Sequence, residues 1–265
     1  MLSGFGSNGS EATKWHEVAE SEVLAKRCWD ATPAGDSGAT DQWIKSGYAA
    51  AAFNQPAGRI GEFWVSRLGF LWRSRPESWG GIPAETADYL AELISEDTPR
   101  SEAVRIAFCR YVHFFHLADQ EWCEQYLFPL LDWETNSSAG AAWSGFLSLG
   151  SFNRNLLTDG FLTMLVAAVS NGDKLDKDGT RNLPNLLAKI ATTADHDLRS
   201  WIRDIITAGT EEANVAWTRA VRFQLNALEP EAVEAQWHKW IRDYMSDRAK
   251  GVPRTLASGF HGNSL

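Results

Sequence analysis

Apolar residues recur along this chain with the spacing of helices that bury one face. The clearest case lies between Thr98 and Trp133, where Thr98 can act as an N-cap and Pro99 as the first helical residue. We expect one helix up to Leu117 and a second helix capped by Asp119. A helix pair this apolar is expected at the centre of the fold. The arc of the first helix consists of Val104, Ala107, Phe108, Tyr111, Phe114 and Phe115.

The same spacing, with proline and glycine as breakers, predicts further helices on both sides of this pair. Strands are not expected, because apolar and polar residues rarely alternate. About twelve helices joined by short loops indicate an all-α protein, and successive pairs of this length favour an irregular HEAT-like α-solenoid array. The further helices are expected near residues 11–30, 40–53, 56–73, 83–94, 142–149, 153–169, 181–192, 195–207, 211–228 and 230–248.

The helix expected over residues 56–73 is apolar on nearly every side and contains Gly58, Gly61 and Gly69. Each glycine would cost about 1 kcal/mol relative to alanine inside a helix. Close approach of a neighbouring helix would offset this cost. We therefore expect this helix to be buried.

The helical pattern stops near both ends of the chain. Residues 1–10 are rich in glycine and serine and are expected to be disordered. Residues 11–250 are expected to form a single helical domain. Gly251 and Pro253 terminate the last helical pattern, so residues 251–265 are expected to form a C-terminal tail.

Composition narrows the classes of partner and location. The formal net charge is -9 and no run of lysine and arginine is longer than two residues, so nucleic acid is not expected as a partner. No apolar stretch reaches the length of about 18 residues that a membrane span needs. The first ten residues lack the basic and apolar regions of a secretory signal. The three cysteines cannot all pair, and so sparse a set indicates a reducing compartment. A cytoplasmic location is expected.

The thirteen tryptophans are scattered from Trp15 to Trp240 rather than clustered. Stacking on a cofactor or a sugar would be one use for so many indole rings. Filling large gaps between irregular helices is the interpretation that scattered positions favour.

A possible metal site lies in the central stretch. Cys109, His113 and His116 are spaced at i, i+4 and i+7, and Cys123 follows seven residues later. On one continuous helix this spacing would place thiol and imidazole groups on one side, as a zinc site requires. Packing of a second helix face explains the same spacing, and no other cysteine or histidine pair completes a familiar site. Packing is favoured, and metal binding by these residues stays open.

Two other polar clusters are weaker candidates. Aligning Gly179 with the glycine of a calcium loop puts Lys174 and Asn185 where Asp and Glu are needed, so residues 171–180 are expected to be an exposed loop. The run Asp195-His196-Asp197 contains acid and base groups. Adjacent residues at a helix start point in different directions, so this run is interpreted as helix-capping acids.

The remaining motif search assigns no catalytic, cofactor-binding or metal-binding residue. The chain contains no G-x-S-x-G elbow, no P-loop and no G-x-G-x-x-G sequence. Arg248 follows the apolar arc of the last helix, and a helix-end carbonyl or carboxylate is favoured over an anion as its partner.

Several spaced fragments together resemble a helical domain of unknown function that is found C-terminal to a sirtuin-like domain in bacterial anti-phage defence proteins. The similarity covers roughly residues 40 to 255, by pattern rather than alignment. The fragments that carry it are Trp43-Ile44, Ala52 to Arg59 (AFNQPAGR), Leu127 to Leu131 (LFPLL), Trp143 to Leu147 (WSGFL), and Trp240 to Tyr244 (WIRDY) with Arg248, Gly251 and Pro253.

In such proteins the sirtuin-like domain hydrolyses NAD, and the helical part is thought to sense infection or hold the assembly together. This chain has no sirtuin-like domain, so no catalytic residue carries over. The resemblance implies a non-enzymatic sensor or scaffold module that binds a phage protein or a partner subunit and regulates a separate NAD-depleting effector. No cofactor is expected, and self-association stays open.

Two alternatives remain. The first is a metal-dependent hydrolase that uses Cys109, His113 and His116. The second is a general HEAT-like adaptor with no role in defence. Stoichiometric zinc that disappears on His113→Ala would favour the hydrolase. A neighbouring gene for a sirtuin-like protein or an NTPase would argue against the general adaptor.

Overall fold

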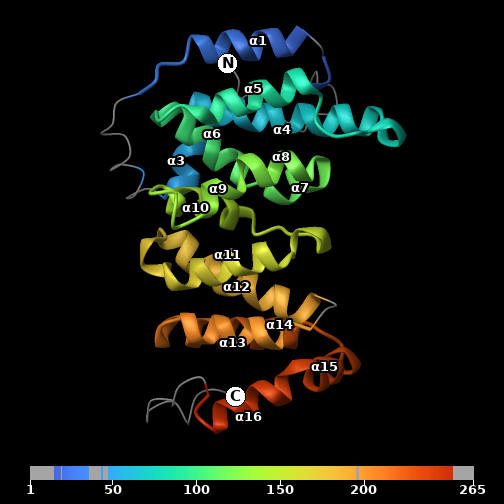
Figure 1. Cartoon of the computed structure of the whole chain (residues 1–265), viewed down its shortest axis with the longest axis vertical. Coiled ribbons are helices and arrows are strands. Elements are labelled where there is room, and N and C mark those ends of the chain that lie inside the picture. The colour runs from blue at the N-terminus through green and yellow to red at the C-terminus, as the bar shows by residue number, and fades with distance from the viewer. Residues whose placement is uncertain (1–14, 19, 36–42, 44–46, 195–196, 253–265) are drawn as a thin grey trace. The chain divides into compact units, whose positions relative to one another are not determined.

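The computed structural model describes residues 15–18, 20–35, 43, 47–194 and 197–252, and every regular element in these ranges is helical (Figure 1). The expected all-α class is therefore confirmed. The expectations for residues 1–10 and 253–265 fall outside this part of the chain. In the part described, no helix combines the length and apolar character that crossing a bilayer requires.

The helices belong to two compact units. Unit 1 comprises Met1–Leu156 and Asp176–Asp178, and unit 2 comprises Leu157–Leu175 and Gly179–Leu265. The single domain expected over residues 11–250 and the solenoid arrangement concern both units together, and both stay predictions.

The helices of unit 1 are α1 (Glu20–Asp30), α3 (Tyr48–Asn54), α4 (Pro56–Ser74), α5 (Ala84–Ser95), α6 (Pro99–Cys109), α7 (Val112–Ala118), α8 (Gln120–Tyr126), α9 (Phe128–Leu131) and α10 (Ala139–Leu149). Those of unit 2 are α11 (Asp159–Ser170), α12 (Lys177–Thr193), α13 (Arg199–Ala208), α14 (Glu211–Asn226), α15 (Pro230–Gln236), the π-helical turn η6 (Trp237–Ile241) and α16 (Arg242–Ala249). The first two residues of α12 are counted in unit 1.

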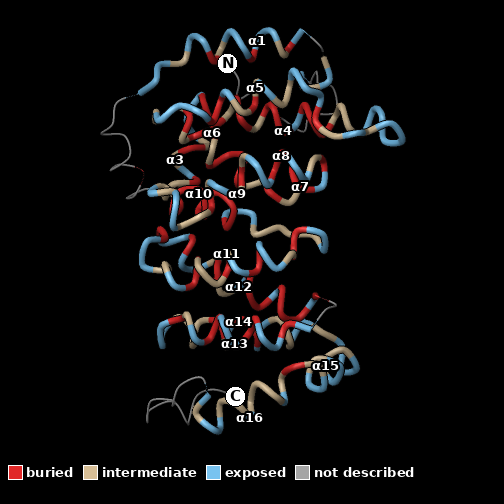
Figure 2. The backbone as a smooth tube through the Cα atoms, in the orientation of Figure 1, coloured by how far each residue is buried: buried red, intermediate tan, exposed pale blue. Residues whose placement is uncertain are grey.

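Helix α6 is the centre of unit 1. Its start follows the expected signals, because Pro99 occupies the first turn and the Thr98 hydroxyl accepts from the Ser101 N–H at 3.4 Å. Helices α3, α4, α5 and α10 all pack against it. Val104, Ala107 and Phe108 of the expected arc are fully buried, and Figure 2 shows buried segments on α6 and on the helices next to it.

Two glycines allow neighbouring helices to approach α6 closely. A Cβ atom at Gly61 of α4 would lie 3.0 Å from the Cβ of Ala107, and one at Gly145 of α10 would overlap the carbonyl oxygen of Ile106. The expected reason for glycine inside the helix of residues 56–73 is therefore found at Gly61. That helix is buried along most of its length, as expected.

The central stretch forms four short helices, so the expectation of two was wrong. Helix α6 ends at Cys109, and Tyr111 has the non-helical angles φ -113° and ψ 24° before α7 begins. A second break at Leu127 separates α8 from α9. Asp119 does cap α8 as expected, because its Oδ1 accepts from the Trp122 N–H at 3.0 Å. Its Oδ2 also accepts from the Ile82 N–H at 3.0 Å, which ties the preceding loop to this cap.

Contacts of Asp176 explain why two further expectations from the sequence were wrong. The helix expected over residues 40–53 does not run through Gly47, whose φ is 87°, and α3 begins only at Tyr48. Asp176 Oδ2 accepts from the Tyr48 N–H at 2.9 Å and from the Ser144 hydroxyl at 2.6 Å. The segment expected to be an exposed loop is therefore partly buried, since Asp176 is 7% exposed.

Two arginines hold helix α1 to the other helices of unit 1. The buried Arg67 of α4 donates to Glu22 at 2.7 Å and to the carbonyl of His16 at 3.0 Å. Arg100 of α6 lies 4.4 Å from the centre of the Trp29 ring and donates to the carbonyl of Thr32 at 3.0 Å. Charged hydrogen bonds of this kind fix the position of a helix that buries few residues of its own.

We expect Gly145→Ala to destabilise unit 1 by about 2–3 kcal/mol, because the added methyl group has to displace the backbone of α6. Urea unfolding followed by tryptophan fluorescence measures this loss. Gly80→Ala is the matched control in the same unit, since no atom lies within 4 Å of its Cβ position. The control should change the free energy of unfolding by less than about 0.5 kcal/mol, and equal effects of the two variants would contradict the close approach at Gly145.

Candidate functional site

A groove of about 390 Å³ lies within unit 2, between α13 and the helical segment η6–α16. Its floor is apolar, because Ile202, Ile206 and Trp240 each expose at most 2% of their surface. Its rim is charged, with four basic and two acidic side chains. These are Arg199, Arg203, Arg248 and Lys250, and Asp243 and Asp247.

The sequence of α13 produces both the floor and one side of the rim. Trp201, Ile202, Ile205 and Ile206 are buried, so they form the inner face of the helix. The Trp201 indole N–H donates to the carbonyl of Leu162 at 3.0 Å, which fixes α13 against α11. Arg199 and Arg203, one turn apart, then project from the outer face with more than half of each side chain exposed.

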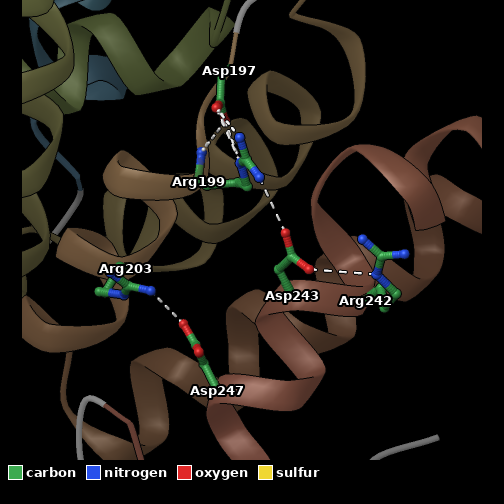
Figure 3. Close-up of polar contacts among 6 residues, drawn as sticks. All are labelled: Asp197, Arg199, Arg203, Arg242, Asp243 and Asp247. Carbon is green, nitrogen blue, oxygen red and sulfur yellow. Dashed lines mark hydrogen bonds and ion pairs between the residues drawn. The ribbon is translucent and has the colours of Figure 1, made fainter.

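Two ion pairs join the two sides of the groove, and we call them the ion-pair ladder (Figure 3). Arg199 Nη1 lies 3.2 Å from Asp243 Oδ2, and Arg203 Nη2 lies 2.6 Å from Asp247 Oδ2. The residues of each helix are four positions apart and share one face, so the two pairs are successive rungs. Because all four side chains reach solvent, each rung contributes little to stability.

Asp197 holds the first arginine of the ladder in place. Its carboxylate accepts from Arg199 Nε at 3.0 Å and from Arg199 Nη2 at 2.6 Å. These hydrogen bonds lower the pKa of Asp197 to about 2. Asp197 also accepts from the backbone N–H of Arg199, as expected for an acid at a helix start, whereas Asp195 and His196 lie outside the described residues.

The opposite side of the groove contains the π-helical turn η6. The helix expected over residues 230–248 does extend across this region, but residues 237–241 form the wider π turn. The Trp240 ring lies 5.9 Å from that of Trp217, and its N–H donates to Gln236 at 2.9 Å. Lys239 donates to the carbonyl of Ala194. Single π turns inside helices are frequent at functional sites, which supports this groove as the candidate site.

Arg248 lies at the end of α16 and also lines the groove. Its Nη1 donates to the carbonyl of Val252 at 3.3 Å. This carbonyl lies beyond the end of α16 at Ala249, so the expected helix-end carbonyl or carboxylate partner stays a prediction.

The Cys/His candidate of the central stretch is divided by the break between α6 and α7. Cys109 ends α6, whereas His113 and His116 belong to α7, so the three residues do not share one continuous helix face. Burial raises the pKa of both the Cys109 and the Cys123 thiols, which disfavours the thiolate form that binds metal. Across the described ranges, no group of three or more His, Cys, Asp or Glu side chains is arranged to hold a metal ion.

His116 is instead packed as a core residue. Its ring stacks on Phe128 with centres 5.9 Å apart and planes 7° apart, and the residue is 3% exposed. Glu124 Oε1 lies 3.7 Å from Nε2, too far for a hydrogen bond, and neither ring nitrogen has a hydrogen-bond partner among the described residues. Burial lowers the pKa of His116, partly offset by the negative charge of Glu124.

Comparisons with known proteins add no relative. No family model matches the chain, and no curated protein and no solved structure matches it significantly.

The four residues of the ion-pair ladder were not predicted from the sequence as a site. Arg199, Arg203, Asp243 and Asp247 look like ordinary surface charges when each helix is considered alone. Their one available signal is the equal spacing of two arginines and two aspartates, each pair separated by four residues. This spacing becomes informative only when α13 is known to pack against α16, because each arginine then faces an aspartate.

We expect Cys28 to react with a thiol reagent in the native protein and Cys109 and Cys123 to react only after unfolding. Cys28 is partly exposed, whereas the other two thiols are buried and have raised pKa values. Labelling followed by mass spectrometry of peptides measures all three sites. If Cys109 is labelled rapidly in the native protein and added zinc suppresses this labelling, the packing interpretation is contradicted and a metal site is favoured.

We expect the stability of the protein to fall as the pH decreases below the usual histidine range, in part because of His116. Its folded-state pKa is lowered, so the unfolded state binds more protons below its own pKa of about 6.5. His116→Gln should reduce this slope while keeping a polar group at the position. Urea unfolding at a series of pH values tests this, and an unchanged slope in the variant would show that His116 does not contribute.

Proposed function

We propose that this chain is a non-enzymatic helical sensor or scaffold module that acts through binding a protein partner. The partner is a phage protein or a subunit of the same defence system, and binding regulates a separate NAD-depleting effector in the bacterial cytoplasm. The observation that carries the binding part of this proposal is the groove of unit 2, with its apolar floor and charged rim.

The defence setting is supported by the sequence fragments that resemble the helical region next to sirtuin-like domains, among them WIRDY at Trp240 to Tyr244. Trp240 forms part of the groove floor, and Asp243 and Tyr244 line the groove. The fragment that contributes to the resemblance therefore coincides with the candidate site. This coincidence supports a binding role for the groove within that setting.

A sensor module has to change its conformation when its partner binds. Only a partner that binds one conformation more tightly than the other can shift the balance between them. The segment on one side of the groove suits such a change. No residue of α15 or α16 is buried, and Trp240 is the one buried residue of η6. Elements with few buried contacts open at low free-energy cost, so binding at the groove can alter this segment without unfolding unit 2.

The proposal is tested by affinity purification of the tagged chain from bacterial cells with and without phage infection. The wild type is compared with Arg199→Gln/Arg203→Gln, which removes the basic half of the ladder. The matched control is Arg219→Gln/Arg222→Gln, which removes two exposed arginines of α14 that do not line the groove. Circular dichroism establishes that all three proteins are folded.

We expect an NAD-hydrolysing subunit or a single phage protein to co-purify with the wild type and the control. Recovery should fall about tenfold with the groove variant, since arginine is enriched among the minority of interface residues whose truncation costs more than about 1 kcal/mol. The purified partner is then mixed with the chain, and NAD consumption is measured with and without it. A partnerless monomer under both conditions would overturn the proposal, and a partner retained by the groove variant would place binding elsewhere.

A further inference from the structure

We propose that the groove of unit 2 takes an acidic segment of a protein partner, whose carboxylates replace Asp243 and Asp247 on Arg199 and Arg203. This inference rests on the proposed function, because it specifies the chemistry of the partner at the same site. The ion-pair ladder would then be an internal competitor that the partner displaces.

The first argument is the local charge. Four basic side chains and two acidic ones line the groove, in a chain whose formal net charge is -9. Arg248 and Lys250 extend the basic rim beyond the two rungs of the ladder. Asp197, which pairs with Arg199 from outside the lining, reduces this positive excess but does not cancel it. The groove therefore favours an acidic ligand over a basic one.

The second argument is that α16 already shows which ligand geometry the arginines accept. Asp243 and Asp247 present two carboxylates one helical turn apart, and each meets one arginine of α13. Arginine side chains bind carboxylates through several N–H groups at once. A partner segment with carboxylates at the same spacing can make the same contacts.

The third argument is that the internal aspartates are easily displaced. The side chains of Asp243 and Asp247 are 42% and 31% exposed, and those of Arg199 and Arg203 are 55% and 57% exposed. Exposed ion pairs are screened by water and salt and contribute little. An incoming segment with more than two carboxylates therefore replaces the rungs at small cost.

The fourth argument concerns the floor beneath the charges. Ile202, Ile206 and Trp240 form an apolar surface between the two rows of charged residues, and Val252 at one end is 38% exposed. An acidic segment that also contains an apolar side chain can cover this surface. Charge then directs the encounter, and apolar contact holds the bound segment.

Displacement of the ladder would leave α16 held chiefly by aromatic contacts. The Tyr244 ring lies 5.4 Å from the Trp217 ring, and no residue of α16 is buried. We therefore expect faster amide hydrogen exchange over residues 242–249 when the acidic segment is bound. This readout separates displacement of the ladder from simple adsorption to the surface.

The test uses the purified full chain and a fluorescein-labelled polyglutamate peptide, with a polyglutamine peptide of the same length for comparison. Fluorescence anisotropy measures binding at low and high salt. Polyglutamate should bind the wild type, and its affinity should fall as salt increases. Polyglutamine should not bind.

Four variants identify the site. Asp243→Asn/Asp247→Asn removes the internal competitor and should raise the affinity for polyglutamate about threefold to tenfold, a gain that unfolding cannot produce. Arg199→Gln/Arg203→Gln should lower it about tenfold. Arg219→Gln/Arg222→Gln on α14 should leave it unchanged. The charge exchange Arg199→Asp/Arg203→Asp/Asp243→Arg/Asp247→Arg should keep two ion pairs across the groove but lose the original affinity.

Several outcomes would overturn the inference. One is that polyglutamate binds neither the wild type nor the Asp243→Asn/Asp247→Asn protein. Another is that Arg199→Gln/Arg203→Gln binds polyglutamate as tightly as the wild type does. A third is that oligothymidylate binds more tightly than polyglutamate, which would indicate a phosphate polyanion as the ligand. None of them depends on a cellular partner. A partner that co-purifies through the groove while polyglutamate fails would therefore remove this inference and leave the proposed function standing.

Discussion

The burial of α6 is the constraint on which unit 1 depends. None of its residues is exposed, so its charged side chains depend on neighbouring groups of the protein for their partners. Glu102 and Arg105 illustrate this requirement: the two side chains pair at 3.2 Å, and Arg105 also donates to the carbonyls of Ile94 and Glu96 at 2.8 and 2.6 Å. Burial raises the pKa of Glu102, and Arg105 opposes that rise.

The last helices of unit 2 differ from α6 in that almost none of their residues is buried. These elements, α15, η6 and α16, bury only Trp240. They are attached by aromatic contacts, exposed ion pairs and two hydrogen bonds to the carbonyls of Thr192 and Ala194 at the end of α12. Such a segment exchanges contacts at small free-energy cost, while the buried inner face of α13 stays in place. The candidate site therefore combines a firm side, which presents two arginines, with a loosely attached side, which presents two aspartates.

The sequence predicted those features that depend on neighbouring residues in the chain. Thr98, Pro99 and Asp119 mark helix starts by local capping chemistry, and the all-α class follows from apolar spacing alone. The break at Tyr111 and the late start of α3 at Tyr48 were not predicted. The second of these depends on the Asp176 carboxylate, which is distant in sequence. The break at Tyr111 also separates Cys109 from His113, so the two residues do not share the helix face that their spacing predicted. The groove escaped prediction because its charges acquire a role only when α13 and α16 meet.

The route of the chain has a consequence for the history of the protein. The chain leaves unit 1 after Leu156, returns for Asp176–Asp178, and enters unit 2 again at Gly179. The returning aspartate satisfies the first N–H of α3 and the Ser144 hydroxyl, both far earlier in the sequence. Neither unit is therefore encoded by one uninterrupted stretch of gene. A recombination event that joined the first 156 residues to another protein would deliver unit 1 without one of its own buried groups, so the two units are expected to have been inherited together.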